Sequence, residues 1–243
     1  MEIFKNLILI GTSHIAKQSI KEVKETINTH LPVVVAVELD QRRLAAVMNP
    51  TNKTDYWSLI KHVGLTGFLF TLLGSYVQKK LGKYVNTMPG SEMKTAIKEA
   101  KKNKLKVALI DQDIAITMRN FSDTITWKER WQFVKDMFWG IFYQKKMLRD
   151  YGLENFDLRT VPGTEMIAKM MKVMKKSYPN VYKSLLADRN KVMARRLWVI
   201  MNKYPEDKIV AVVGAGHEEG ILKILKRYVK NNVEVSLSFG EPF

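Results

Sequence analysis

The chain has 243 residues, and 40 lysines and arginines against 24 aspartates and glutamates leave a formal net charge of +16. Its hydrophobic share of 46% is enough for an ordinary globular core, so we expect one large domain or two small ones. The absence of cysteine excludes a disulfide scaffold, a thiolate zinc site and a cysteine nucleophile. The positive charge is dispersed in lysine-rich runs typical of solvated helix faces, and we therefore expect no nucleic-acid partner.

The first 50 residues alternate between strand and helix patterns. Residues 6–10 (NLILI) predict a buried strand, and residues 14–29 predict an amphipathic helix. Pro32 then opens a continuous run of mainly β-branched residues, which is typical of a parallel strand covered by helices on both faces. The run ends in Asp40, which we expect to cap a helix over residues 40–48.

A long apolar and helical segment follows over residues 55–85. Its uncharged part, residues 63–77, is shorter than the roughly 20 residues that a helix needs to cross a bilayer. We therefore expect a buried or partner-facing helix, which leaves open a homodimer through residues 55–85 and contact with a membrane surface. Because the N-terminus lacks the pattern of a secretory signal, a cytoplasmic or membrane-associated location is expected.

The second half of the chain is helical in the middle and returns to strands at its end. Residues 106–110 predict a strand that ends at Asp111, and most of residues 114–203 have helical periodicity. Residues 209–214 predict another buried strand, and residues 233–239 (VEVSLSF) a last one.

This order of elements predicts an α/β fold with a mostly parallel central sheet built from both chain ends and a large helical insertion. Neither end alone has enough strands for a core, so the two ends are expected to meet in one sheet. We expect a single domain over residues 1–243, with an α/β core of about residues 1–50, 86–118 and 205–243 and a helical subdomain of about residues 51–85 and 119–204.

Two strands end in the same pattern of a glycine followed three residues later by a histidine. Gly11 precedes His14 and Gly214 precedes His217, which uses two of the four histidines in the chain. The glycine permits a sharp turn, and a histidine near a helix N-terminus is disfavoured from protonation and so available to a metal. Glu38 follows a third strand, and two imidazoles with one carboxylate form a common ligand set for a catalytic divalent cation. The alternative for each pattern is an ordinary turn whose histidine caps a helix.

The segment GAGHEEG, residues 214–220, also has the glycine spacing of part of a phosphate-binding loop. Glu218 and Glu219 argue against that interpretation, because they place negative charge where a phosphate would lie.

Several segments together resemble the TraB/PrgY family, which is related to the TIKI proteins and to a wider group containing GumN, ChaN and erythromycin-esterase-like proteins. The resemblance covers nearly the whole chain in order, and it is carried by GTSH at 11–14, VELD at 37–40 followed by Arg43, PGSEM at 89–93, LIDQDIAITMRN at 109–120, LLADRNKVMARRL at 185–197 and VVGAGHEEGI at 212–221. It implies the α/β fold of erythromycin-esterase-like and ChaN-like proteins.

The TIKI relatives are metal-dependent proteases with two such glycine–histidine patterns and an essential acid. The resemblance therefore implies that His14 and His217 are metal ligands and that Glu38 is a ligand or a general base. It also implies manganese or cobalt rather than zinc. ChaN-like relatives bind haem, which makes haem an alternative ligand of the same edge.

Four more residues match family positions. We expect Glu92 and Arg189 to be catalytic, as a second carboxylate near the site and as a group that stabilises an oxyanion. Arg119 and Arg43 are expected to bind the substrate. A structural role is the alternative for these positions, with Glu92 in the first turn of a helix and the arginines in ion pairs between elements.

Two classes of function remain. The first is a divalent-metal-dependent, metallopeptidase-like hydrolase acting on peptides, which the likeness to PrgY extends to the inactivation of a signalling peptide. The second is a regulator at a membrane that binds or sequesters a peptide or haem without turnover. Some TraB/PrgY members carry a C-terminal membrane region, which is not evident before Phe243.

Overall fold

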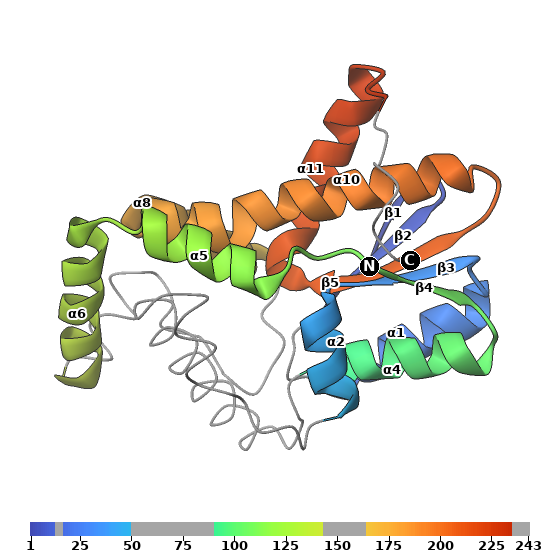
Figure 1. Ribbon diagram of the computed structural model, residues 1–243, viewed down its shortest axis with the longest axis horizontal. Helices are drawn as coiled ribbons and strands as arrows, with labels where there is room; N and C mark the ends of the chain where they lie inside the picture. Colours follow the sequence, from blue (N-terminus) through green and yellow to red (C-terminus); the bar gives the residue numbers. More distant parts are fainter. Residues whose placement is uncertain (13–16, 50–89, 143–163, 235–243) are drawn as a thin grey trace.

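The structure is a computed structural model that describes residues 1–12, 17–49, 90–142 and 164–234. A five-stranded sheet with the strand order β1-β2-β5-β3-β4 lies at its centre (Figure 1). Its strands are β1 (Glu2–Phe4), β2 (Leu7–Thr12), β3 (Val34–Val37), β4 (Lys106–Leu109) and β5 (Ile209–Gly214).

Both chain ends contribute to the middle of this sheet. Strand β5, close to the C-terminus, lies between β2 and β3 and is parallel to both. Strand β4 pairs with β3, again in parallel. The expectation of a mostly parallel sheet built from the two ends of the chain is therefore confirmed.

Strand β1 is a feature that the apolar pattern did not predict. It pairs with β2 in antiparallel register, with Ile3 opposite Ile8, through a tight turn at Lys5 and Asn6. Lys5 adopts a positive φ of 53°, which a turn normally assigns to glycine or asparagine. Without a glycine, and with only three residues, this edge strand has no clear signature in the sequence.

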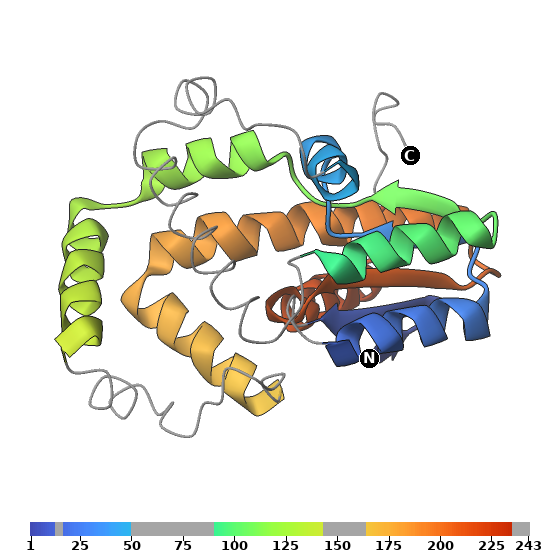
Figure 2. The same cartoon turned by 90° about the horizontal axis from the view of Figure 1, so that it is seen from below.

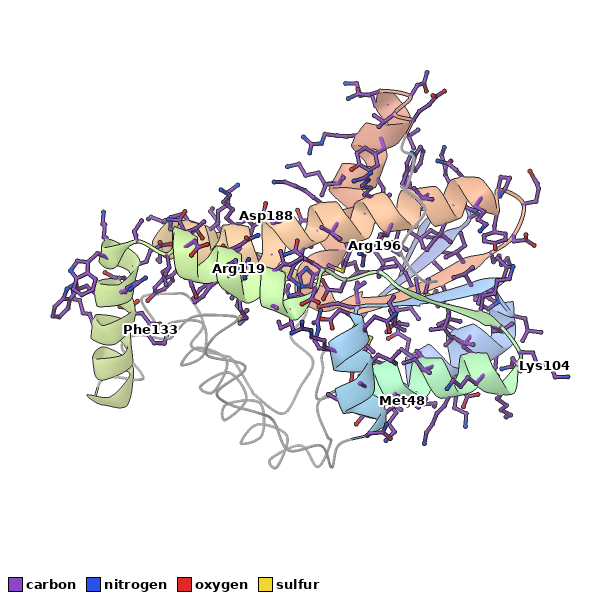
Figure 3. All side chains as sticks on the ribbon, viewed as in Figure 1. Met48, Lys104, Arg119, Phe133, Asp188 and Arg196 are labelled. Carbon is purple, nitrogen blue, oxygen red and sulfur yellow. The ribbon has the colours of Figure 1, made fainter. Side chains whose placement is uncertain are left out.

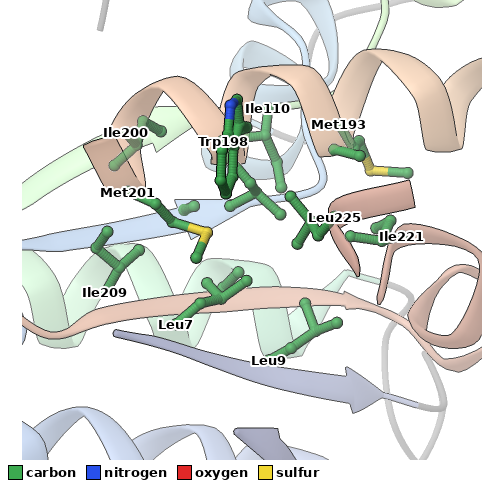
Figure 4. Close-up of a cluster of buried hydrophobic side chains, with 14 of the residues drawn as sticks. Leu7, Leu9, Ile110, Met193, Trp198, Ile200, Met201, Ile209, Ile221 and Leu225 are labelled. Atoms are coloured by element: carbon green, nitrogen blue, oxygen red, sulfur yellow. The ribbon is translucent and has the colours of Figure 1, made fainter. Parts of the chain in front are cut away.

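Helices cover both faces of the sheet. Alternate residues of a strand point to opposite faces, so Leu7 and Leu9 pack on one side and Ile8 and Ile10 on the other. Helices α10 (Asp188–Lys203) and α11 (Ala215–Lys230) cover the first face. Leu7 and Leu9 of β2 share a buried cluster there with Met193, Trp198, Ile221 and Leu225 of these helices (Figure 4). The opposite face is covered mainly by α1 (Lys17–His30) and α4 (Ser91–Lys102), which lie side by side in Figure 2.

Helix α2 (Gln41–Met48) begins where it was expected to begin. Asp40 is its N-cap, and the Asp40 side chain accepts a hydrogen bond of 2.9 Å from the backbone N–H of Arg43. This is the usual way to satisfy a donor that the first helical turn leaves without a partner.

The described parts of the segment between β4 and β5 consist of helices joined by short connections, as expected. Its helices before α10 are α5 (Ile114–Thr124), α6 (Trp127–Phe142), α8 (Thr164–Ser177), the short α9 (Pro179–Tyr182) and the π-helical turn η1 (Lys183–Ala187), which leads directly into α10. Figure 1 shows that α10 runs along the sheet and extends beyond its edge toward these helices.

Two expectations fall outside the described residues. These are the apolar segment 55–85, with its dimer or membrane contact, and most of the strand expected over residues 233–239. Among the helices that are described, none combines the length and the apolar character that a bilayer crossing requires.

Candidate functional site

The carboxyl ends of four parallel strands meet at one edge of the sheet. The register pairs Thr12 with Gly214, and Val37 with both Val212 and Leu109. Residues that directly follow these strands therefore share this edge, which is the usual place for a ligand in an open parallel sheet. Thr12 is buried, and its hydroxyl donates a 3.1 Å hydrogen bond to the carbonyl of Val213. His14 comes two residues later and lies outside the described residues.

Glu38 is a buried carboxylate held from two sides. Its side chain is only 5% exposed. Oε2 accepts a 2.6 Å hydrogen bond from the backbone N–H of Gly214, and Oε1 accepts one from Nη2 of Arg189. The backbone N–H of Glu38 also extends the sheet ladder by donating to the carbonyl of Val212 at 3.1 Å. The carboxylate is thereby fixed against the start of α11.

His217 lies in the first turn of α11, as the glycine–histidine pattern predicts. Its Nε2 is 3.3 Å from Oε1 of Glu38. Its Nδ1 is 2.6 Å from Oδ1 of Asn190, a residue of α10. His217 and both of its partners are buried, so the imidazole has one orientation, with Nε2 directed at the carboxylate.

These two side chains fit a divalent cation. Adjacent ligand atoms of a four- to six-coordinate ion lie about 3.0–3.6 Å apart, which includes the separation of Nε2 and Oε1. His14 completes the ligand set expected from the sequence, but it is not among the described residues. Within the ranges that the structure describes, no group of three histidine, aspartate and glutamate side chains is placed to hold a metal.

Arg189 connects Glu38 to a second buried carboxylate. Its Nε donates to Oδ1 of Asp111 at 3.0 Å and its Nη2 to Oδ2 at 2.5 Å, in addition to the bond with Glu38. Burial alone would lower the pKa of Arg189, but the two carboxylates raise it above its ordinary value. Arg189 is therefore a permanent cation that orients the Glu38 carboxylate from within the protein.

Arg43 extends the same network toward α2. Its Nε donates to Asp40 at 2.7 Å, and its Nη2 donates to Asp111. Burial would lower the pKa of Arg43, but Asp111 and Asp40 raise it. The pair of Arg43 with Asp111 thus joins two elements, whereas its pair with Asp40 lies within the start of α2, and its side chain is 27% exposed.

Glu92 and Arg119 are the other two residues that the sequence predicts for the site. Glu92 is buried in the first turn of α4. Helix α4 runs antiparallel to β4, so its first turn lies at the same end of the sheet as Glu38. Arg119 is exposed on α5, in the helical insertion (Figure 3). The contacts described here do not assign either residue to a reaction.

Comparison with known proteins shows what the chain is related to. A profile of the TraB/PrgY/gumN family matches residues 4–236.

The chain belongs to the TraB/PrgY/gumN family.

An uncharacterized protein of Methanocaldococcus jannaschii is 35% identical to this TraB/PrgY/gumN chain over 231 residues, which are 93% of the chain and 55% of that protein. The TraB domain-containing proteins of mouse and human are each 26% identical, over 88% of the chain and 61% of their own length. The chain thus spans a little over half of the length of these curated relatives. The resemblance seen in the sequence is confirmed at the level of the family.

Glu218 is a partly buried acid next to His217 in this TraB/PrgY/gumN chain, and the sequence did not single it out as functional. Its carboxylate lies against Gly11, where an added Cβ would be 2.2 Å from Oε2. Burial raises the pKa of Glu218, and the N-terminal amine of Met1, 3.9 Å from Oε1, opposes this shift. The glycine of the first glycine–histidine pattern therefore also makes room for a side chain of the second.

The sequence likewise does not indicate the roles of Asn190 and Asp111. In the sequence, Asp111 is only a polar residue at the end of a strand, although it binds both Arg43 and Arg189 in the structure. Asn190 directly follows Arg189 in the sequence, and this adjacency was its only signal. Both depend on where α10 lies relative to the sheet, which the local pattern does not reveal.

Proposed function

We propose that this chain is a divalent-metal-dependent hydrolase acting on peptide or related amide bonds. The observation that supports it most is the 3.3 Å separation between Oε1 of Glu38 and Nε2 of His217 at the carboxyl edge of the sheet. His217, Glu38 and His14 are the residues that would hold the ion. Family resemblance favours manganese or cobalt, which accept mixed nitrogen and oxygen ligands.

A bound divalent cation supplies a Lewis acid for a carbonyl oxygen and lowers the pKa of a water. The protein's own groups then provide orientation. Gly214 and Arg189 hold the two oxygens of Glu38, so that Oε1 faces the imidazole of His217, where it would ligate the cation or accept a proton. Because Oε1 carries two lone pairs, the bond from Arg189 does not by itself prevent either role.

Arg189 acts on Glu38 in this proposal and not directly on a substrate oxyanion. Its guanidinium is committed to Glu38 and Asp111, and its side chain is only 13% exposed. Arg43, which is partly exposed, and Arg119, which is exposed on α5, are the cations better placed to meet a carboxylate of a peptide. Inactivation of a signalling peptide is the biological role that the resemblance favours.

The test combines metal binding with peptide cleavage. We expect the purified chain to bind one Mn²⁺ or Co²⁺ and to cleave members of a quenched-fluorescence peptide library. The variants His14→Ala, His217→Ala and Glu38→Gln should lose both properties. His30→Gln is the matched control, because His30 ends α1 at the opposite end of the sheet and its described contact is with Lys208.

Full metal binding and activity in His217→Ala would contradict the assigned site. If the wild-type chain binds a peptide and releases it intact after long incubation with metal, the chain is a sequestering protein and the hydrolase proposal fails.

A further inference from the structure

We propose that Asn190 is a positioning residue that fixes the tautomer of His217, and that the missing side chain of Gly220 makes this possible. The bond between Oδ1 of Asn190 and Nδ1 of His217 is 2.6 Å long, and both residues are at least 95% buried. An amide oxygen only accepts hydrogen bonds, so this contact requires a proton on Nδ1. In the neutral ring the lone pair is then on Nε2, which faces Glu38.

Gly220 leaves the space in which the Asn190 amide lies. A Cβ built at Gly220 would lie 2.1 Å from Nδ2 and 3.0 Å from Cγ of Asn190. The amide nitrogen therefore occupies the space that a side chain at position 220 would fill, and the oxygen is turned to the imidazole. A reversed amide would instead present its NH₂ group to Nδ1 and leave the proton of a neutral ring on Nε2.

A π-helical turn directly precedes the helix that carries Asn190. The π-helical turn Lys183–Ala187 ends directly before α10, and such turns widen the helix by one residue and often occur at functional sites. Arg189 donates from Nη1 to the carbonyl of Leu185 in this turn at 3.0 Å. After the turn, two consecutive residues reach the same site, since Arg189 binds Glu38 and Asn190 binds His217.

This arrangement has a consequence for metal binding, which rests on the proposed function. A metal ligand must offer a lone pair, and a hydrogen bond at the other ring nitrogen both fixes the ring and increases its basicity. Loss of such an outer-shell partner typically weakens metal binding about 10- to 100-fold. Asn190 would thus act on a cation through His217, without touching it.

The tautomer can be measured in the metal-free chain. Long-range ¹H–¹⁵N correlation spectra of ¹⁵N-labelled protein distinguish the protonated from the unprotonated ring nitrogen. Since the chain has four histidines, the spectrum of a His217→Gln variant identifies the signals of His217. We expect wild-type His217 to carry its proton on Nδ1 at a pH where the ring is neutral.

Four variants give the comparison. In Asn190→Leu and Gly220→Ala, Nδ1 should lose its fixed proton, and the affinity for Mn²⁺ measured by calorimetry should fall about 10- to 100-fold. Asn190→Asp keeps an acceptor and should keep the Nδ1 proton. Gly216→Ala is the matched control on the same helix, because the nearest atoms to an added Cβ are 3.6 Å away, and it should leave the tautomer unchanged.

Circular dichroism and urea unfolding identify any variant that has lost its fold, and the Gly220→Ala variant provides a second test if Asn190→Leu does not fold. The inference is overturned if wild-type His217 carries its proton on Nε2, or if folded Asn190→Leu retains the Nδ1 proton of the wild type. A wild-type chain with the Nδ1 proton but no affinity for Mn²⁺ would support the inference and count against the proposed function.

Discussion

Oε1 of Glu38 lies 3.3 Å from Nε2 of His217, although Glu38 follows β3 and His217 opens α11. The sheet is responsible for this proximity. Strand β3 pairs with β5, the backbone of Glu38 continues the ladder to Val212, and the Glu38 side chain accepts from the N–H of Gly214 at the start of the turn. The two side chains are thus held by backbone hydrogen bonds of a buried parallel sheet, which is a rigid support for a site.

The first prediction concerns the buried charge of Arg189. The substitution Arg189→Met should reduce the free energy of unfolding by about 3–5 kcal/mol, because it leaves the carboxylates of Glu38 and Asp111 without their shared cation. Urea unfolding followed by circular dichroism measures this loss. Lys191→Met on the same helix is the control, since its ion pair with Asp188 is on the surface and should contribute less than about 1 kcal/mol. Equal effects of the two substitutions would show that Arg189 is not the centre of the network.

The second prediction compares two glycines of the glycine–histidine segments. In Gly11→Ala, the added Cβ would lie 2.2 Å from Oε2 of Glu218 and 3.3 Å from Cα of Ala215. The Glu218 side chain can move, but the backbone of α11 cannot easily do so, and we expect a loss of about 1–3 kcal/mol in the free energy of unfolding.

Gly216→Ala provides the comparison for Gly11→Ala. It meets only ordinary contacts at 3.6 Å within a helix, where alanine is favoured over glycine by about 0.5–1 kcal/mol. Urea titrations should therefore move the two midpoints in opposite directions. A destabilised Gly216→Ala variant would mean that the start of α11 requires glycine for its backbone.

The third prediction is a pH dependence that originates at Glu129, at the start of α6. Its buried carboxylate accepts hydrogen bonds from the backbone and side chain of both Asn180 and Thr126. Burial alone would raise the pKa of Glu129, but these donors stabilise the ionised form and lower the pKa below its usual 4.5. The unfolded chain therefore takes up this proton at a higher pH than the folded chain. The stabilisation is complete above the usual pKa and is lost as the pH falls through the lowered one.

Glu129→Gln tests this sign. Compared with the wild type, the variant should be less stable by about 1–3 kcal/mol near pH 7, and the difference should shrink when unfolding is measured near pH 3. The control is Glu25→Gln, whose exposed pair with Lys21 should contribute little at either pH. A difference between Glu129→Gln and wild type that is the same at both pH values would exclude the ionised carboxylate as its cause.

Several parts of the fold were predictable because single segments carry their own signal. The continuous apolar runs before Gly11 and Gly214 and before Glu38 are typical of strands buried on both faces, and these strands form the middle of the sheet. Strand β1 was missed because its three residues are mostly exposed and its turn uses Lys5 with a positive φ. Its position follows from pairing with β2 and not from its own pattern.

The site was predictable to a similar extent. That Glu38 and His217 face one edge follows from parallel strands having their carboxyl ends together. The partners of these two residues were not predictable, because Arg189 and Asn190 reach them from a helix whose position depends on the packing of α10 across the sheet. A sequence motif can thus identify side chains at strand ends. Side chains that reach the site from a helix packed on the sheet can be identified only from the structure.

The position of β5 between β2 and β3 also determines when the sheet can close during synthesis. Strands β2 and β3 both form their ladders with β5, so the centre of the sheet stays open until residues 209–214 have left the ribosome. Until then β2 can pair only with β1, and β3 only with β4, so one edge of each is left open and prone to aggregation. The closure over such a long separation is slow. A nascent chain arrested before β5 should bind holding chaperones and gain protease resistance only after that strand emerges.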